Sequence, residues 1–348
     1  MEDKTSKTMT QPGEPKRMRT IMLEEHFATP AFIEGPGRYL KERAQADNAS
    51  PQAITEVTKF IERVSDIGER RIAEMDAAGI DVQALSLLTP GVEQLDANEA
   101  VEIAHDVNDR VADAIRRHPG RFVGLASLPT AIPDKAAQEL ERMVSKHGFK
   151  GAVINGHNRG RYLDDSFFWT ILECAEALRV PIYLHPTPPP KAVIEASYAG
   201  NYALQVTAAL ARTAWGWHIE TATHVLRLIL SGAFDKYRNL QIIIGHMGEA
   251  LPFMLPRIDS SLPRELTKLN YPVGTYLREN VYYSFGGFNY THCFLDLLLQ
   301  VGAERILFSA DYPYKTMESA MAFLDQLPVS PMDKERIAHG NAECLLKI

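Results

Sequence analysis

Eight short apolar segments recur along the chain, and a longer segment of helical character follows all of them but the sixth. The apolar segments are 20–26, 81–87, 122–127, 150–155, 180–185, 240–246, 280–285 and 305–310. Most are apolar at nearly every position, which is typical of parallel strands that are buried on both faces. Parallel neighbours need crossover connections, so this order predicts an α/β fold.

The segments between the strands have the spacing of amphipathic helices. The predicted helices are 69–78, 96–118, 133–147, 165–178, 216–234, 290–302, 316–326 and 333–346. Eight strands that alternate with helices predict a (β/α)8 TIM-like barrel. The alternative is an open, doubly wound sheet, which usually carries a Gly-rich nucleotide turn after its first strand. Here Phe27-Ala28-Thr29-Pro30 follows that strand, and no Gly-rich phosphate motif follows any strand.

The 348 residues are enough for one large barrel or two smaller domains. Since no repeat or low-complexity linker divides the chain, we expect a single domain over 19–348. Residues 1–18 are polar and mixed in charge, without the apolar core of a secretory signal, and they predict a disordered tail. Two insertions, 30–66 and 186–215, follow the first and fifth strands. They are therefore expected as loops at the barrel end that carries active sites, where they serve as lids, oligomer contacts or plain surface.

Composition excludes several classes of protein. The net charge of −7 argues against nonspecific nucleic-acid binding. No apolar run approaches the ~20 residues of a membrane helix. The three cysteines, Cys174, Cys293 and Cys344, are scattered and odd in number, which indicates reduced thiols and a cytoplasmic protein.

Polar side chains collect where the predicted strands end. Glu24 and His26 end the first strand, Asn155 the fourth and His185 the fifth, while His246 ends the sixth with Glu249 just beyond, and Asp311 follows the eighth. A single residue of this kind is ordinary, but in a barrel all these strand ends meet at one rim. Imidazole and carboxylate groups are good ligands for a divalent ion, so the set predicts a metal site.

Glu24 and His26 are the most informative pair in this set. Residues two apart on a strand point to the same face, so both side chains should face the same side. In a closed barrel the eighth strand pairs with the first, so Asp311 should lie beside them. His218, which opens the predicted helix 216–234, is interpreted as a capping or packing residue, although that helix start could face the site.

The same residues carry a family resemblance. It rests on Leu23-Glu24-Glu25-His26-Phe27, Asn155-Gly156, Leu184-His185-Pro186, Gly245-His246-Met247-Gly248-Glu249 and Phe308-Ser309-Ala310-Asp311-Tyr312-Pro313. From about Arg19 to Ile348 the chain resembles the amidohydrolase-related family. It is most similar to the decarboxylase branch, the γ-resorcylate, 2,3-dihydroxybenzoate and 5-carboxyvanillate decarboxylases. The usual His-x-His is replaced here by Glu24-x-His26, which is typical of this branch.

The resemblance implies a role for each matching residue. It implies one divalent metal, Zn²⁺, Mn²⁺ or Mg²⁺, in a homodimer or homotetramer that acts on a small aromatic carboxylic acid. The implied ligands are Glu24, His26, His185 and Asp311, with His246 and Glu249 as further acid/base residues and Asn155, Arg257 and Tyr314 on the substrate side.

Three departures from the family pattern concern the substrate pocket rather than the metal. Thr187 follows His185-Pro186 where the family often has arginine. Tyr312 stands where tryptophan is frequent, and Tyr314 where phenylalanine is common. The resemblance therefore identifies the metal site more firmly than the substrate.

Three functions are compatible with these residues. In a non-oxidative decarboxylase, the metal binds the carboxylate and the ortho phenolic oxygen of a hydroxybenzoate, and Asp311 protonates the ring carbon. In a hydrolase of an amide, a lactone or a C–C bond, the same ligands activate a water molecule and Asp311 takes its proton. A non-catalytic barrel would bind no stoichiometric metal. The resemblance favours decarboxylation.

Overall fold

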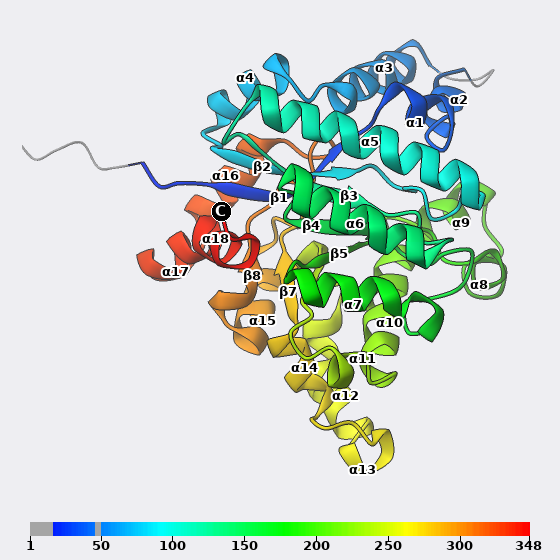
Figure 1. Ribbon diagram of the computed structural model, residues 1–348, viewed down its shortest axis with the longest axis vertical. Helices are drawn as coiled ribbons and strands as arrows, with labels where there is room; N and C mark the ends of the chain where they lie inside the picture. The colour runs from blue at the N-terminus through cyan, green and yellow to red at the C-terminus, as the bar shows by residue number, and fades with distance from the viewer. Residues whose placement is uncertain (1–16, 46–49) are drawn as a thin grey trace, which may run out of the picture.

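The computed structural model describes residues 17–45 and 50–348. Its centre is one sheet of eight parallel strands in the order β1 to β8 (Figure 1). The strands are β1 Ile21–Phe27, β2 Val82–Leu87, β3 Phe122–Ser127, β4 Gly151–Asn155, β5 Ile182–His185, β6 Ile242–Ile244, β7 Val281–Ser284 and β8 Ile306–Leu307. All eight predicted strands are confirmed, although β6 and β8 end earlier than expected.

Hydrogen bonds between the first and last strands close the sheet. The N–H of Leu23 donates to the carbonyl of Phe308 at 2.9 Å, and the N–H of His26 donates to that of Tyr312 at 2.8 Å. A closed parallel sheet surrounded by helices is a (β/α)8 barrel, so the predicted fold is confirmed.

The helices fill the connections and surround the barrel. They are α1 Pro30–Glu34, α2 Tyr39–Gln45, α3 Pro51–Ser65, α4 Glu69–Ala78, α5 Ala97–Arg117, α6 Pro133–His147, α7 Trp169–Leu178, α8 Lys191–Ser197, α9 Leu204–Leu210, α10 Gly216–Leu230, α11 Ala233–Lys236, α12 Leu251–Ser261, α13 Arg264–Thr267, α14 Val273–Glu279, α15 Thr291–Val301, α16 Met317–Asp325, α17 Pro331–Glu335 and α18 Asn341–Leu346. Short turns η1 Ser166–Phe168, η2 His246–Gly248 and η3 Ala303–Arg305 and the π-helical η4 Arg336–Gly340 complete the elements.

The core has two parts. Ile21, Leu23, Tyr183, Ile243 and Leu307 belong to a buried cluster inside the barrel, and a larger apolar layer lies between the strands and the helices. The last helix, α18, adds side chains to the inner cluster and so closes the end of the barrel where the strands begin. The candidate functional site lies at the opposite end of the barrel, where the strands finish.

Several predicted elements differ in detail. The predicted helix 333–346 is interrupted by the π-helical η4, and 216–234 is split into α10 and α11 by Gly232, whose φ is 79°. No helix was predicted over 251–279, where the structure has α12 to α14. Pro252 stands in the first turn of α12, while Pro263 and Pro272 precede α13 and α14. Proline favours the start of a helix, where no N–H is needed.

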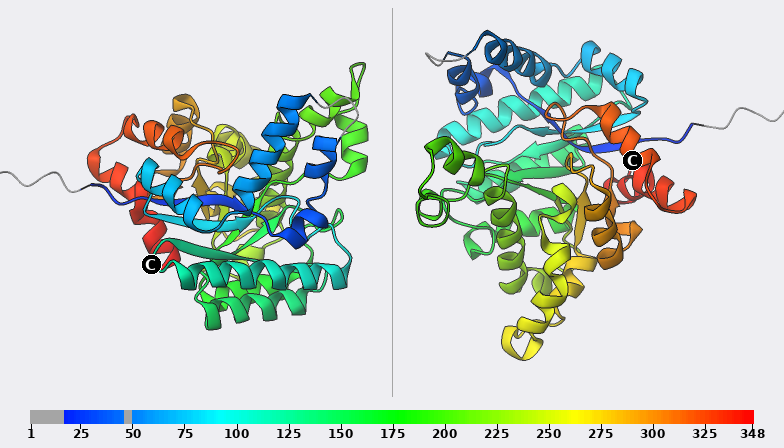
Figure 2. Two further views of the ribbon diagram at one scale, coloured as in Figure 1. Left: turned by 90° about the horizontal axis from the view of Figure 1, so that it is seen from above. Right: turned by 180° about the vertical axis from the view of Figure 1, so that it is seen from behind.

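Both insertions are where the sequence placed them, but they are largely helical rather than loops. The first contains α1, α2 and α3, and the second contains α8 and α9. In the left view of Figure 2 these two segments project on the same side of the barrel. Most of the predicted tail lies outside the described residues; Arg17 pairs with Asp81, and Met18 packs against the core.

Two further sequence expectations concern membranes and thiols. Among the helices of the described segments, none combines the length and apolarity needed to cross a bilayer. Cys174, Cys293 and Cys344 are free thiols on α7, α15 and α18.

Candidate metal centre and active site

A bulge in β1 positions the first two candidate ligands. The register with β2 shifts between Leu23 and Glu25, and Glu24, the extra residue, has a φ of 83°. In a regular strand, consecutive side chains point to opposite faces. Leu23 could therefore not face the same side of the sheet as Glu24 and His26. The bulge allows it, so Leu23 fills the barrel while Glu24 and His26 reach the site. The sequence predicted that Glu24 and His26 share a face, but not this distortion.

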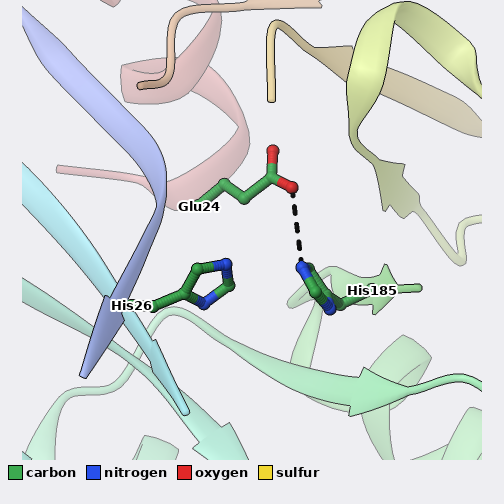
Figure 3. A group of neighbouring side chains, drawn as sticks. All are labelled: Glu24, His26 and His185. Carbon is green, nitrogen blue, oxygen red and sulfur yellow. Dashed lines mark ion pairs between the residues drawn. The ribbon is translucent and has the colours of Figure 1, made fainter. Parts of the chain in front are cut away.

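Glu24, His26 and His185 form a compact buried group (Figure 3). One ligand atom from each lies within 4.8 Å of the others. Oε1 of Glu24 is 3.8 Å from Nε2 of His185, and its Oε2 accepts a hydrogen bond from Ser284 at 2.6 Å. Side chains from β1 and β5, distant in sequence, therefore converge at the rim.

Asp311 completes the group from the end of β8. Its Oδ1 lies 3.2 Å from Nε2 of His26, and its side chain is 16% exposed, whereas the side chain of His26 is fully buried. The predicted neighbourhood of Asp311 and His26 is thus present. Asp311 and His185 are the members of the group that line the open cavity.

The donor atoms suit a divalent cation. Oε1 of Glu24 and Nε2 of His26 are buried and have no hydrogen-bond partner among the described residues. Such atoms are costly to bury unless something else satisfies them. Nδ1 of His185 donates to the carbonyl of Pro186 at 2.9 Å, which leaves Nε2 as a free lone pair. Burial, together with the neighbouring His26 and His246, holds the pKa of His185 well below its usual range, so the neutral, ligating form is favoured.

His246, Glu249 and His218 form a second buried group next to the first. Nδ1 of His246 donates to Oε1 of Glu249 at 2.7 Å, and Nδ1 of His218 lies 2.5 Å from Oε2. Burial alone would lower the pKa of His246, but the charges of Glu249 and Glu24 outweigh it and raise that pKa to about 10. Glu249 therefore contacts two imidazole rings, those of His246 and His218. His218, interpreted from the sequence as a capping or packing residue, lies in the site.

The backbone of this second group is unusual. Residues 246–250 all have positive φ, from 52° at His246 to 93° at Gly248. Such conformations are strained for residues other than glycine and concentrate at functional sites. This left-handed run also explains why β6 ends at Ile244 rather than at His246.

Two glycines allow this close packing. A Cβ at Gly245 would lie 2.6 Å from Oε1 of Glu24, and a Cβ at Gly286 would lie 2.4 Å from the backbone nitrogen of His246. Any larger residue would push the Glu24 carboxylate or the His246 turn out of place.

Glu25 is a further residue of the site that sequence reasoning did not single out. Its two carboxylate oxygens accept hydrogen bonds from the backbone N–H groups of Ala310, at 2.9 Å, and Tyr312, at 3.2 Å. These residues flank Asp311, whose φ is 65°. Glu25 therefore fixes the turn that presents Asp311, and the duplicated glutamate of the Glu-Glu-His motif was the available sequence signal.

A buried arginine contacts the chain at the ends of both β1 and β8. Arg71 donates to the carbonyl of His26 at 2.7 Å, and its guanidinium lies over the ring of Tyr312 at 4.5 Å. It therefore ties the ends of β1 and β8 together next to the candidate ligands.

The site opens into a cavity of about 390 Å³. Its lining is Thr89, His185, Thr213, Trp217, His218, His246, Gly286, Gly287, Phe288, Tyr290, Asp311, Tyr314 and Lys315. Of the three predicted substrate-side residues, Tyr314 lines this cavity. Asn155 is buried and bonded through its N–H to Glu93 at 2.8 Å, and Arg257 is exposed on α12. Neither belongs to the lining, so their roles stay predictions.

Comparison with known proteins identifies the family of this chain. The family model described as amidohydrolase matches residues 39–348, so the chain belongs to the amidohydrolase family. It is 37% identical over 339 residues to a gamma-resorcylate decarboxylase of Polaromonas sp. (strain JS666), covering 94% of this chain and 98% of that protein. The resemblance drawn from the motifs is confirmed.

Solved structures of decarboxylases are also similar to this chain in sequence and in fold. A 5-carboxyvanillate decarboxylase from Novosphingobium aromaticivorans, complexed with manganese and 4-hydroxy-3-methoxy-5-nitrobenzoic acid, superposes with a TM-score of 0.86 at 34% identity, covering 98% of this chain and 100% of that one. A dihydroxybenzoic acid decarboxylase from Polaromonas sp. JS666, with bound manganese and the inhibitor 2-nitroresorcinol, gives 0.83 at 36% identity, covering 95% and 97%.

Proposed function

We propose that the protein is a metal-dependent, non-oxidative decarboxylase of a hydroxybenzoate-type aromatic acid. The observation that carries this is the buried group at the barrel rim: the unpartnered atoms of Glu24 and His26 lie beside Asp311 at the base of a cavity with aromatic walls. Relatives with this fold, more than 30% identical over almost the whole chain, are decarboxylases of such acids.

Glu24, His26, His185 and Asp311 would hold one divalent ion. Mn²⁺ is the first choice because two structural relatives contain it, while the donor set also suits Zn²⁺ and Mg²⁺. When bound, the ion would supply Lewis acidity that offsets the negative charge of the substrate carboxylate and phenolic oxygen.

Asp311 is the proposed proton donor. A ring π-electron pair forms the new C–H bond with the Asp311 proton at the carbon that carries the carboxylate. The C–C bond then breaks, CO₂ leaves, and the bonding pair restores the aromatic ring. Asp311 combines proximity to the ligand group with access to the cavity, as a general acid must.

The surrounding residues would orient Asp311 and the substrate. Glu25 holds the backbone on both sides of Asp311. His246, fixed by Glu249, presents its Nε2 toward Glu24 at 3.8 Å. Phe288 and Trp217 provide an apolar wall that excludes water around a flat ring. Tyr314, Asn155 and Arg257 remain the proposed substrate-side residues.

Product analysis separates this proposal from the hydrolase alternative. The Mn²⁺-loaded protein is incubated with γ-resorcylate in deuterated water, and we expect CO₂ together with one deuterium in the ring of the product. If no CO₂ forms, but ¹⁸O from labelled water enters an acid product made from an amide or ester, the protein is a hydrolase.

We also infer a homodimer or homotetramer and a cytoplasmic location. Large apolar side chains are exposed on α12 and α15, including Phe253 at 76% and Leu299 at 82%, which favours a contact between copies. The three free thiols suit a reducing compartment. Light scattering tests the first inference; a monomer at micromolar concentration would contradict it.

A further inference from the structure

A second, larger cavity adjoins the one at the metal centre. It measures about 790 Å³ and shares Thr89, Thr213, Trp217 and Tyr314 with the inner cavity of about 390 Å³. None of the four candidate metal ligands lines it. We call this space the vestibule: it lies directly beside the inner cavity, and the four shared residues line both spaces.

Much of the vestibule wall comes from the two insertions. Tyr39 on α2 contributes from the first, and Pro188, Ala208 and Ala209 contribute from the second. These walls are largely apolar, because alanine, proline and aromatic side chains predominate among the lining residues. The left view of Figure 2 shows both segments projecting beyond the same end of the barrel.

One charged side chain stands in this apolar lining. Arg212, between α9 and α10, forms no ion pair with any acidic side chain of the described segments, and no carboxylate lines the vestibule. Gln205 is a second polar group there. The wall therefore offers an apolar surface with a cation and hydrogen-bond donors on it.

We propose that the vestibule is a substrate subsite for an extended ring substituent. The substituent points away from the carboxylate that is lost, is apolar along most of its length, and ends in an anionic or hydrogen-bond-accepting group that Arg212 binds. The inner cavity alone is within the usual size range for a small-molecule site, about 300–1,000 Å³. A single-ring acid would thus leave the vestibule empty. This inference rests on the decarboxylase proposed above and names its substrate class.

Three acids test the subsite in the full-length Mn²⁺ protein. They are γ-resorcylate, γ-resorcylate with a six-carbon alkyl chain para to the carboxylate, and the same compound with a carboxylate at the end of the chain. We expect the third to have the highest kcat/KM and the lowest Kd by calorimetry. An acid without a chain that outperforms both chained acids overturns the proposal.

Two substitutions separate the apolar wall from the cation. Ala209→Trp should fill the vestibule and lower kcat/KM for both chained acids at least tenfold, while γ-resorcylate stays within about twofold. Arg212→Gln should weaken only the acid with the terminal carboxylate, by about tenfold, since a charged hydrogen bond is lost. An equal loss for all three acids, with or without a change in oligomeric state, assigns the vestibule to a subunit contact or to general structure and overturns the proposal.

The outcomes also distinguish this inference from the proposed function. If no acid releases CO₂, the decarboxylase proposal fails. The vestibule is then judged on binding alone: Arg212→Gln must raise the Kd of the carboxylate-ended acid and leave that of γ-resorcylate unchanged, and equal Kd changes count against it.

Discussion

The β1/β8 seam, where the end of β8 meets β1, and the second insertion both contribute side chains to the cavity at one end of the barrel, but the two regions differ in burial. At the seam, Glu24, Glu25 and His26 are fully buried, and backbone and side-chain hydrogen bonds cross from one strand to the other. In the second insertion, by contrast, neither α8 nor α9 contains a buried residue.

This difference in burial matches two different roles: the seam holds the groups that react, and the insertions line the space that decides which substrates fit. A reaction centre must hold its groups within narrow limits, and the seam does so by burial and by a carboxylate that bonds both flanks of Asp311. A substrate wall needs only shape and a few polar groups, so it can change without loss of the centre. Substitutions at the seam should therefore affect every substrate, and substitutions in the insertions only some.

The largest effect at the seam is expected for Asp311→Asn. Because an amide cannot replace the carboxylic acid as proton donor, kcat should fall by about 10²–10⁴ for every acid that is turned over. The measurement is the initial rate of CO₂ release. Asp325→Asn, on the exposed end of α16, is the matched control. If Asp311→Asn retains wild-type kcat, Asp311 is not the acid.

Glu25→Gln should have the next largest effect. The amide has one acceptor oxygen where the carboxylate has two, so the N–H of Ala310 or of Tyr312 loses its partner and faces another donor. Groups that support metal ligands typically contribute 10–100-fold to metal affinity or activity. We expect a loss of about that size in Mn²⁺ affinity or kcat.

A purely structural role for Glu25 would give a different result. It would lower the unfolding midpoint while leaving Mn²⁺ affinity and kcat of the folded protein unchanged, and that outcome would contradict the positioning role. Glu335→Gln, exposed at the end of α17, is the control for the loss of one negative charge.

The same contrast explains what the sequence could predict. Near-continuous apolar runs identify buried parallel strands, and closure of eight strands places Asp311 beside His26, so the fold and the polar cluster at the rim follow from simple rules. The choice of four metal ligands within that cluster came from the family resemblance. The bulge at Glu24 and the left-handed backbone of residues 246–250 depend on packing between segments that are distant in sequence, so no local sequence pattern predicts them. Glu25 and His218 act through partners distant in sequence, which only the folded chain reveals.

The insertions were the hardest part to predict. In the second insertion, helices α8 and α9 are short and bury no residue, so they show little of the apolar periodicity that identifies a helix. Pro190, at the end of the proline-rich segment 186–190, directly precedes α8.

The smallest expected effect concerns Glu93, which lies in the connection between β2 and α5. It is buried and accepts the N–H of Asn155 at 2.8 Å, and burial raises its pKa from 4.5 to about 7. Between these values the folded state binds the proton more tightly than the unfolded state. The free energy of unfolding therefore decreases as pH rises through this window, by on the order of 2–3 kcal/mol in total.

Glu93→Gln should remove this pH dependence. Relative to the wild type, the variant should gain stability between pH 5 and pH 8, as measured by urea unfolding at both values. Its Mn²⁺ affinity should not change, since Glu93 contacts none of the candidate ligands in the described hydrogen bonds. Parallel pH profiles for the two proteins would show that Glu93 does not titrate in this range.

Metal removal and replacement test the central claim most directly. The protein is treated with a chelator, its metal content is measured by elemental analysis, and CO₂ release from γ-resorcylate is followed as Mn²⁺ is added back. We predict no CO₂ from the metal-free protein and full recovery at one Mn²⁺ per chain. Undiminished CO₂ release from protein with no measurable metal would contradict a metal-dependent decarboxylase.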